Sequence, residues 1–99
     1  MEDKNFILNK LLENKNLLKT YNVSKIGLFG SFVRDEAGQA SDIDLLIDFA
    51  EPVTIFQFVE LKNALEELFK RKVDLGTFDA IKPVIMENIL REAIIIEGL

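Results

Sequence analysis

The chain has 99 residues, 48% of them hydrophobic and 29% charged, a balance typical of a compact globular domain. We expect one domain over residues 1–99, with a single core too small to enclose two substrates between lobes. The net charge of −5 disfavours bulk nucleic-acid binding, because that binding depends on Lys and Arg replacing counterions. Without cysteine or histidine, any metal in this sequence needs oxygen ligands. Neither a basic leader nor a long apolar run is present, so we expect a cytoplasmic protein that does not enter the membrane.

The first third of the chain predicts a helix and a strand. Residues 3–21 show helical spacing of apolar residues, and Asn22 can end this helix. Residues 26–29 form a short apolar run typical of a strand. Ser31 follows a glycine and can cap a short helix. The apolar residues that define the first helix are Leu8, Leu11, Leu12 and Leu18.

The rest of the chain alternates strands and helices. Residues 42–49 and 73–77 read as strands, residues 54–70 and 81–91 as amphipathic helices, and residues 93–97 as a possible fourth strand. This order predicts an α+β layered fold in which a small mixed sheet of three to four strands packs with helices.

Three aspartates are candidates for metal binding. Side chains alternate across a strand, so Asp42 and Asp44 should share one face, while Asp74 should point away from the core side taken by Val73 and Leu75. If the two strands are neighbours, the three carboxylates converge. The alternative is that each is an ordinary solvated carboxylate.

Three clustered carboxylates repel one another unless a cation binds. Mg²⁺ suits oxygen ligands and commonly takes one or two carboxylates together with substrate phosphates. Two such ions, roughly 3.5–4 Å apart, can clamp the attacking and leaving oxygens of a phosphoryl transfer.

Gly30-Ser31 is a candidate phosphate-binding turn. A small residue at the start of a short helix exposes backbone N–H groups and a hydroxyl to phosphate oxygens. Taken alone, the pair favours a simple capped turn, because Gly-Ser pairs are common.

Gly30-Ser31, ten intervening residues and then Asp42-Ile43-Asp44 resemble the signature of the DNA polymerase β nucleotidyltransferase superfamily. Residues 29–34 (FGSFVR) and 41–46 (SDIDLL) are similar to the motifs of its minimal nucleotidyltransferase (MNT) group, and Asp74 lies where the third carboxylate belongs. The resemblance covers nearly the whole chain and implies the polymerase β-like nucleotidyltransferase fold.

The resemblance also implies roles for individual residues. Asp42 and Asp44 would bind both of two Mg²⁺ ions, and Asp74 the ion nearer the acceptor hydroxyl. These three aspartates would be the catalytic residues.

The nucleotide, expected to be ATP, would be bound by the Gly30-Ser31 turn, with Ser31 contacting the triphosphate and Arg34 as a further candidate. Asp35 departs from the family pattern, which usually has Gly after the Arg, and adds a negative charge beside the phosphate loop.

The implied reaction is attack of an acceptor hydroxyl on the α-phosphorus of ATP, with release of pyrophosphate. Asp74 or water would take the proton. In the MNT family the acceptor can be a tyrosine of a HEPN ribonuclease toxin, whose AMPylation silences it, so we expect an antitoxin that forms a hetero-oligomer with a HEPN partner. Two alternatives remain: a non-catalytic antitoxin that neutralises its partner by binding alone, and a nucleotidyltransferase acting on RNA ends or a small molecule.

Overall fold

The computed structural model describes residues 3–38 and 41–99, which form a four-stranded sheet with helices on both faces. The elements follow one another as α1 (Lys4–Glu13), α2 (Lys15–Thr20), β1 (Val23–Phe29), the 3₁₀ helix η1 (Gly30–Phe32), β2 (Ile43–Phe49), α3 (Ile55–Phe69), β3 (Val73–Thr77), the 3₁₀ helix η2 (Phe78–Ala80), α4 (Pro83–Glu92) and β4 (Ile94–Glu97). The strand order is β3-β2-β1-β4. The pairs β1–β2 and β1–β4 are antiparallel and β2–β3 is parallel, so the sheet is mixed, as predicted.

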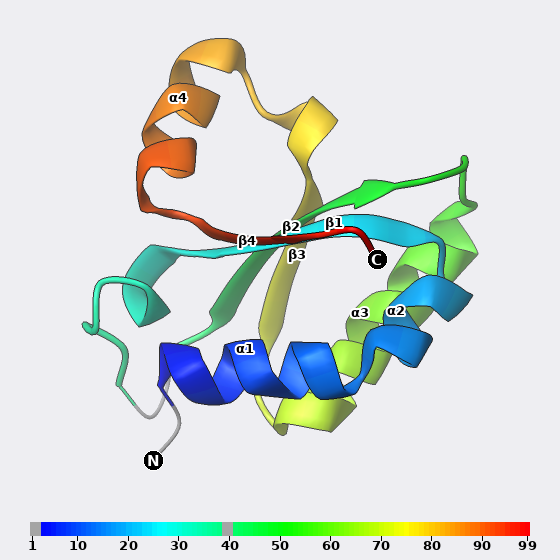
Figure 1. Ribbon diagram of the computed structural model, residues 1–99, viewed down its shortest axis with the longest axis horizontal. Coiled ribbons are helices and arrows are strands. Elements are labelled where there is room, and N and C mark those ends of the chain that lie inside the picture. Colours follow the sequence, from blue (N-terminus) through cyan, green and yellow to red (C-terminus); the bar gives the residue numbers. More distant parts are fainter. Residues whose placement is uncertain (1–2, 39–40) are drawn as a thin grey trace.

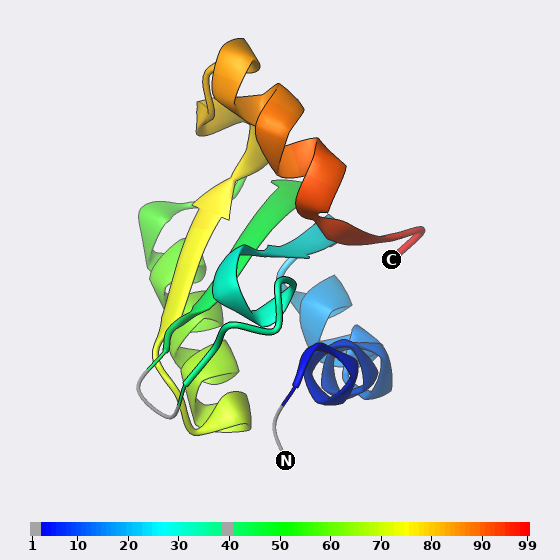
Figure 2. The ribbon, with the colours of Figure 1, turned by 90° about the vertical axis from the view of Figure 1, so that its left-hand side faces the viewer.

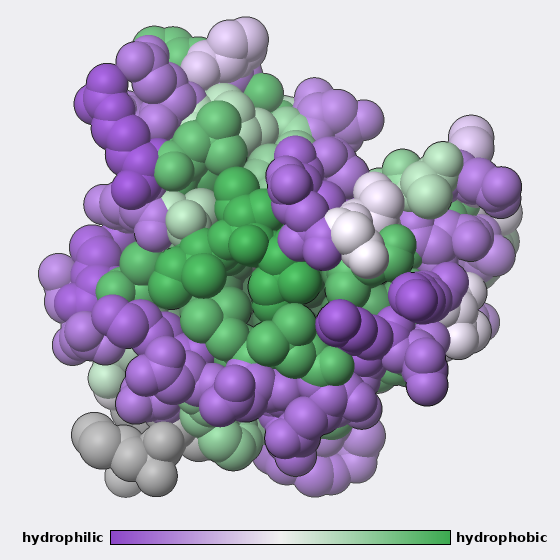
Figure 3. Space-filling view, viewed as in Figure 1, coloured by the Kyte–Doolittle hydropathy of each residue, from purple (hydrophilic) through white to green (hydrophobic). Residues whose placement is uncertain are grey.

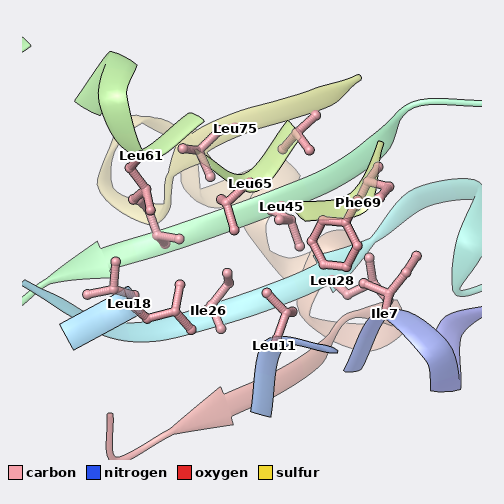
Figure 4. Close-up of a cluster of buried hydrophobic side chains, with 14 of the residues drawn as sticks. Ile7, Leu11, Leu18, Ile26, Leu28, Leu45, Leu61, Leu65, Phe69 and Leu75 are labelled. Carbon is pink, nitrogen blue, oxygen red and sulfur yellow. The ribbon is translucent and has the colours of Figure 1, made fainter. Parts of the chain in front are cut away.

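The main core lies between the sheet and the helices α1, α2 and α3. Figure 1 shows these helices on one side of the sheet and α4 on the other. Alternate residues of the central strands point into this core, and the side chains of Ile26, Leu45 and Ile47 are fully buried. Figure 4 shows how leucines from α1 and α3 meet these strand residues.

The opposite face of the sheet is covered only at one end. There Phe78 lies over Gly27, where an added Cβ would come within 3.0 Å of the phenyl ring, and Leu46 lies over Gly76. The Lys25 ammonium lies over the Phe78 ring, 4.5 Å from its centroid, and forms a cation–π contact there. Figure 2 shows α4 standing over the same face. The carboxylates of Asp44 and Asp74 lie at the other end of this face, where β2 and β3 begin.

Two helices differ from the prediction. The single helix expected over residues 3–21 is broken at Asn14, whose φ of −112° and ψ of 32° leave the helical region and whose side chain donates a hydrogen bond to the Lys10 carbonyl. Asparagine side chains compete in this way for backbone groups, which favours a break. The last helix begins at Pro83 rather than Ile81, because proline is preorganised for the first helical position and lacks an N–H to satisfy.

The strand β4 is one edge of the sheet, and Ile94, Ile95 and Ile96 are only partly buried. Figure 3 shows apolar surface gathered over the region where β4 runs in Figure 1. Phe56 is 77% exposed on α3. Within the ranges that the structure describes, no helix is long and apolar enough to cross a membrane.

Candidate active site

Asp44 on β2 and Asp74 on β3 stand side by side. The two strands are parallel neighbours, and the register pairs Asp44 directly with Asp74. On each strand the residues that flank the aspartate are buried: Ile43 and Leu45 around Asp44, with Val73 on β3 also fully buried. Strand alternation therefore sends both carboxylates to the face opposite the main core, as the sequence predicted.

Asp42 lies one residue before β2, which begins at Ile43 rather than at Asp42. Its side chain is exposed, while that of Asp44 is half-buried. Burial raises the pKa of the Asp44 carboxyl above its ordinary value, and the negative charges of Asp74 and then Asp42 raise it further, against an opposing effect of Arg34. The three predicted carboxylates thus share one electrostatic environment.

Gly30 fits directly against the Asp44 carboxylate. Its φ is +80°, in the left-handed region that glycine adopts without strain. A Cβ placed on Gly30 would lie 2.2 Å from Asp44 Oδ2, closer than any two such atoms can approach. Only glycine satisfies both conditions, so the turn after β1 and the start of β2 are fitted to each other.

Ser31 lies inside the 3₁₀ helix rather than capping it. The helix runs from Gly30 to Phe32, with Phe29 at its N-terminal boundary and no side-chain cap. The Gly30 carbonyl accepts the N–H groups of Val33 and Arg34 at 3.1 and 3.3 Å. Within the part of the chain that the structure describes, the Ser31 hydroxyl has no hydrogen-bond partner, and it is half-buried beside the turn.

Arg34 is held by two carboxylates. Its Nε donates to Glu36 at 3.2 Å and its Nη1 donates to Glu92 of α4 at 3.1 Å. These contacts, that with Glu36 first, raise the pKa of the guanidinium, with burial acting in the opposite direction. The partner Glu92 is 58 residues away along the chain and carries no motif that sequence analysis could have used.

The Asp35 departure has a structural explanation. Asp35 has a φ of +57°, a left-handed conformation that glycine adopts readily and that aspartate tolerates better than most residues. Its carboxylate forms an ion pair with Lys4 of α1, 3.3 Å away. The extra charge that the sequence placed beside the phosphate loop is therefore paired with a cation.

The donor set suits a hard divalent cation. Asp44 and Asp74 supply carboxylate oxygens from adjacent strands, and Mg²⁺ commonly takes one or two carboxylates and completes its shell with water and phosphates. Among the residues with described positions, no three acidic side chains converge closely enough to form a complete metal cage. The pair therefore fits an ion that shares its coordination with a bound nucleotide.

A hollow on the described surface lies away from these carboxylates. It has a volume of about 620 Å³ and is lined by residues that include Asp48, Glu51, Phe58 and Asp79, at the end of β2 remote from Asp44. The three candidate aspartates are not part of its lining. The carboxylates and the Gly30 turn are the better candidate site, because they offer specific chemistry, whereas the hollow is distinguished by its shape alone.

A mixed sheet that pairs two carboxylates beside a glycine turn is an arrangement that suits a nucleotidyltransferase. The chain belongs to the polymerase beta nucleotidyltransferase family, whose profile matches residues 12–98. It is 41% identical over 80 residues to the protein adenylyltransferase MntA of Thermococcus cleftensis, covering 81% of each chain.

Solved structures agree with this assignment. One provisionally named a minimal nucleotidyltransferase superposes with a TM-score of 0.80 at 33% identity, covering 94% of this chain and 95% of that one. A complex of tri-AMPylated Shewanella oneidensis HEPN toxin with MNT antitoxin matches with a TM-score of 0.67 at 20% identity, covering 93% of this chain and 72% of that one. At this identity the likeness shows the shared fold. The predicted family and fold are confirmed.

Proposed function

We propose that this protein transfers AMP from ATP to a hydroxyl group of a partner protein, a tyrosine of a HEPN toxin, and acts as its antitoxin. The observation that carries the proposal is the pairing of Asp44 with Asp74 against the Gly30 turn. The name of the Thermococcus cleftensis relative supports adenylyl transfer to protein, and the Shewanella oneidensis complex supports a HEPN partner.

Each residue of the site has a distinct task in this proposal. Asp42, Asp44 and Asp74 would hold two Mg²⁺ ions, which neutralise phosphate charge and lower the pKa of the acceptor hydroxyl when bound. The Gly30 backbone allows the triphosphate to approach closely, because no side chain stands in the way. The hydroxyl of Ser31 donates to a phosphate oxygen.

Arg34 binds the triphosphate in place of one of its present carboxylate partners. Its guanidinium is already presented to carboxylate oxygens of Glu36 and Glu92, and phosphate oxygens offer the same geometry with more charge. The positive charge of Arg34 opposes the rise in the pKa of the Asp44 carboxyl, so the guanidinium acts on the carboxylates of the site.

The chemical step is an in-line displacement. The acceptor oxygen attacks the α-phosphorus, the bond from that phosphorus to the bridging oxygen breaks, and pyrophosphate leaves with the bonding electrons. Asp74 is exposed at the open end of the sheet face and takes the acceptor's proton, because this sequence has no histidine for that role.

The test is transfer of label from α-³²P-ATP with Mg²⁺ to a HEPN protein offered as acceptor. The control is the double variant Asp42→Asn, Asp44→Asn, and tyrosine-to-phenylalanine variants of the partner locate the acceptor. Label on the partner that is absent with the control and lost with one tyrosine supports the proposal. Tight binding and toxin inhibition without ATP and without label would instead identify an antitoxin that acts by binding alone. Label on RNA or on an aminoglycoside offered in parallel would also overturn it.

A further inference from the structure

Arg71 lies where the three segments of the candidate site meet. Its Nη1 donates hydrogen bonds to the carbonyl oxygens of Ser41 at 2.9 Å and Gly38 at 3.1 Å. The centre of its guanidinium is 5.1 Å from the ring centroid of Phe32. Ser41 immediately precedes Asp42, Phe32 immediately follows Ser31, and Arg71 itself stands three residues before Asp74.

We propose that Arg71 is a positioning residue that fixes Asp42 and the Gly30-Ser31 turn relative to β3, so that metal and nucleotide ligands are in place before substrate binds. This inference rests on the proposed function of the site. In this proposal Arg71 acts through its neighbours, and its contacts include two backbone carbonyls and an aromatic ring.

Asp42 depends on such an outside contact. It lies before the first residue of β2, at the end of a connection that begins after η1 at Val33. Strand pairing positions Asp44 and Asp74, but it does not extend to Asp42. On the far side of Asp42, the Ile43 N–H donates to the Lys72 carbonyl at 3.0 Å. On the near side, the contacts that hold the end of the connection include the Arg71 hydrogen bonds, the bond from the Gly38 N–H to Ser41 Oγ at 2.8 Å, and the turn bond from the Ser41 N–H to the Gly38 carbonyl.

Arg71 is itself held on rigid structure. Helix α3 ends at Phe69, and the next residue, Lys70, turns the chain with a φ of +53°. The Arg71 N–H donates to the Glu66 carbonyl at 3.3 Å. The Phe32 ring is 2% exposed, so the surface on which the guanidinium stacks belongs to the core. The guanidinium of Arg71 thus connects the core and the end of α3 to the residue that precedes Asp42.

The geometry requires arginine rather than a positive charge alone. A guanidinium can donate within its plane to two carbonyls while its face lies on an aromatic ring, whereas an ammonium has no face to stack. Replacement by lysine therefore retains the charge and part of the hydrogen bonding, and replacement by methionine retains only the aliphatic length.

The experiment compares wild type with Arg71→Met and Arg71→Lys, and with Arg91→Met as the matched control. Arg91 lies exposed on α4 and bonds to Glu87 of the same helix, so its loss makes the same change in charge away from the site. Three quantities are measured for each protein: hydrogen exchange of residues 32–38 and 41–44, affinity for a fluorescent ATP analogue with Mg²⁺, and kcat and KM for ATP in transfer to the HEPN partner.

Arg71→Met is expected to speed exchange in the two segments, to weaken nucleotide affinity and to raise KM about tenfold, the size expected for losing hydrogen bonds from a charged donor. Saturating ATP and Mg²⁺ should recover most of kcat, because bound ligands then order the segments. Arg71→Lys should fall between Arg71→Met and wild type, and Arg91→Met should match wild type.

A lower melting temperature with unchanged exchange in these segments and unchanged KM would overturn the proposal, since a purely structural role predicts that result. Equal effects of Arg71→Met and Arg91→Met would also overturn it. If wild type transfers no label, the proposed function fails, and hydrogen exchange in the ligand-free protein still decides whether Arg71 fixes the two segments.

Discussion

Replacing Gly30 by alanine tests whether the turn and the Asp44 carboxylate are fitted to each other. The substitution has two separable costs. A φ of +80° is unfavourable for an L-residue by about 1–2 kcal/mol, and the new methyl group would lie 2.2 Å from Asp44 Oδ2, so the carboxylate must move. Restricting the unfolded chain recovers about 0.4–1 kcal/mol.

The chain offers two matched controls for these costs. Gly98 has a φ of +74° but no atom within 4 Å of an added Cβ, so Gly98→Ala isolates the backbone strain near the end of the chain. Gly38 has neither a positive φ nor a neighbour within 4 Å, so Gly38→Ala reports the general effect of the substitution. The difference between Gly30→Ala and the controls measures the displacement of Asp44.

We expect Gly30→Ala to lose about 1–3 kcal/mol of unfolding free energy, which lowers the melting temperature by several degrees, roughly 4–8 °C per kcal/mol in a domain of this size. Because Asp44 must move, Mg²⁺-dependent transfer should fall by far more than the unfolded fraction explains. The assays are urea and thermal unfolding, followed by labelled transfer at a temperature where every variant is folded. Transfer by Gly30→Ala at the wild-type rate would refute the fitted arrangement, and so would equal losses in Gly30→Ala and Gly98→Ala.

Three further predictions address charge and capping. The folded-state pKa of Asp44 is raised, so ionisation of Asp44 costs stability as pH rises above the ordinary value of 3.8. Asp74→Asn removes part of the repulsion and should therefore stabilise the Mg²⁺-free protein at pH 7, while weakening Mg²⁺ binding about 100-fold or more. Thermal unfolding with and without Mg²⁺ measures both effects. A lower melting temperature without Mg²⁺ would contradict this reasoning. The pKa of Glu66 is lowered, chiefly because the Val73 N–H donates to the Glu66 carboxylate at 2.9 Å, so the carboxylate should stabilise the fold at neutral pH and cease to do so as pH falls below the ordinary pKa of 4.5. Glu66→Gln should therefore be less stable than wild type at pH 7 and nearly as stable at pH 3. A stability difference that does not depend on pH would contradict this prediction. Thr54→Ala removes the side-chain cap of α3 and should cost about 1 kcal/mol in urea unfolding without changing KM for ATP, which an unchanged unfolding midpoint would disprove.

Local patterns in the sequence predicted much of the sheet. The bounds of β3 are as predicted, and β2 differs only at Asp42, because alternating burial is a property of neighbouring residues. The same alternation placed Asp44 and Asp74 on the face away from the core. Whether the two strands were neighbours remained conditional, since strand pairing is decided by packing across the whole chain and only the structure supplied the parallel register.

The features that sequence analysis missed depend on contacts between distant residues or on competition within a turn. Arg71 reaches carbonyl groups 30 and 33 residues away. In the sequence it is an arginine just after a predicted helix, a position where a cation commonly interacts with the helix dipole. The helix break at Asn14 depends on a side chain competing with its own backbone. Phe56 illustrates a further limit: helical spacing cannot distinguish an apolar residue that faces the core from one that faces out.

The candidate site maintains a repulsion that the fold could easily have avoided. Parallel pairing of β2 and β3 sets Asp44 beside Asp74, and Gly30 closes over Asp44 and helps to desolvate it. A serine or asparagine at either position would satisfy strand geometry without the repulsion, so packing alone does not explain two carboxylates. The repulsion is relieved when a cation binds, and a ligand that binds only the folded state stabilises it by about 2.7 kcal/mol at 100 times its Kd. The sheet, the turn and the Arg71 contacts therefore favour the same state, in which Asp44 and Asp74 are close together and the proposed metal ions would neutralise their charge.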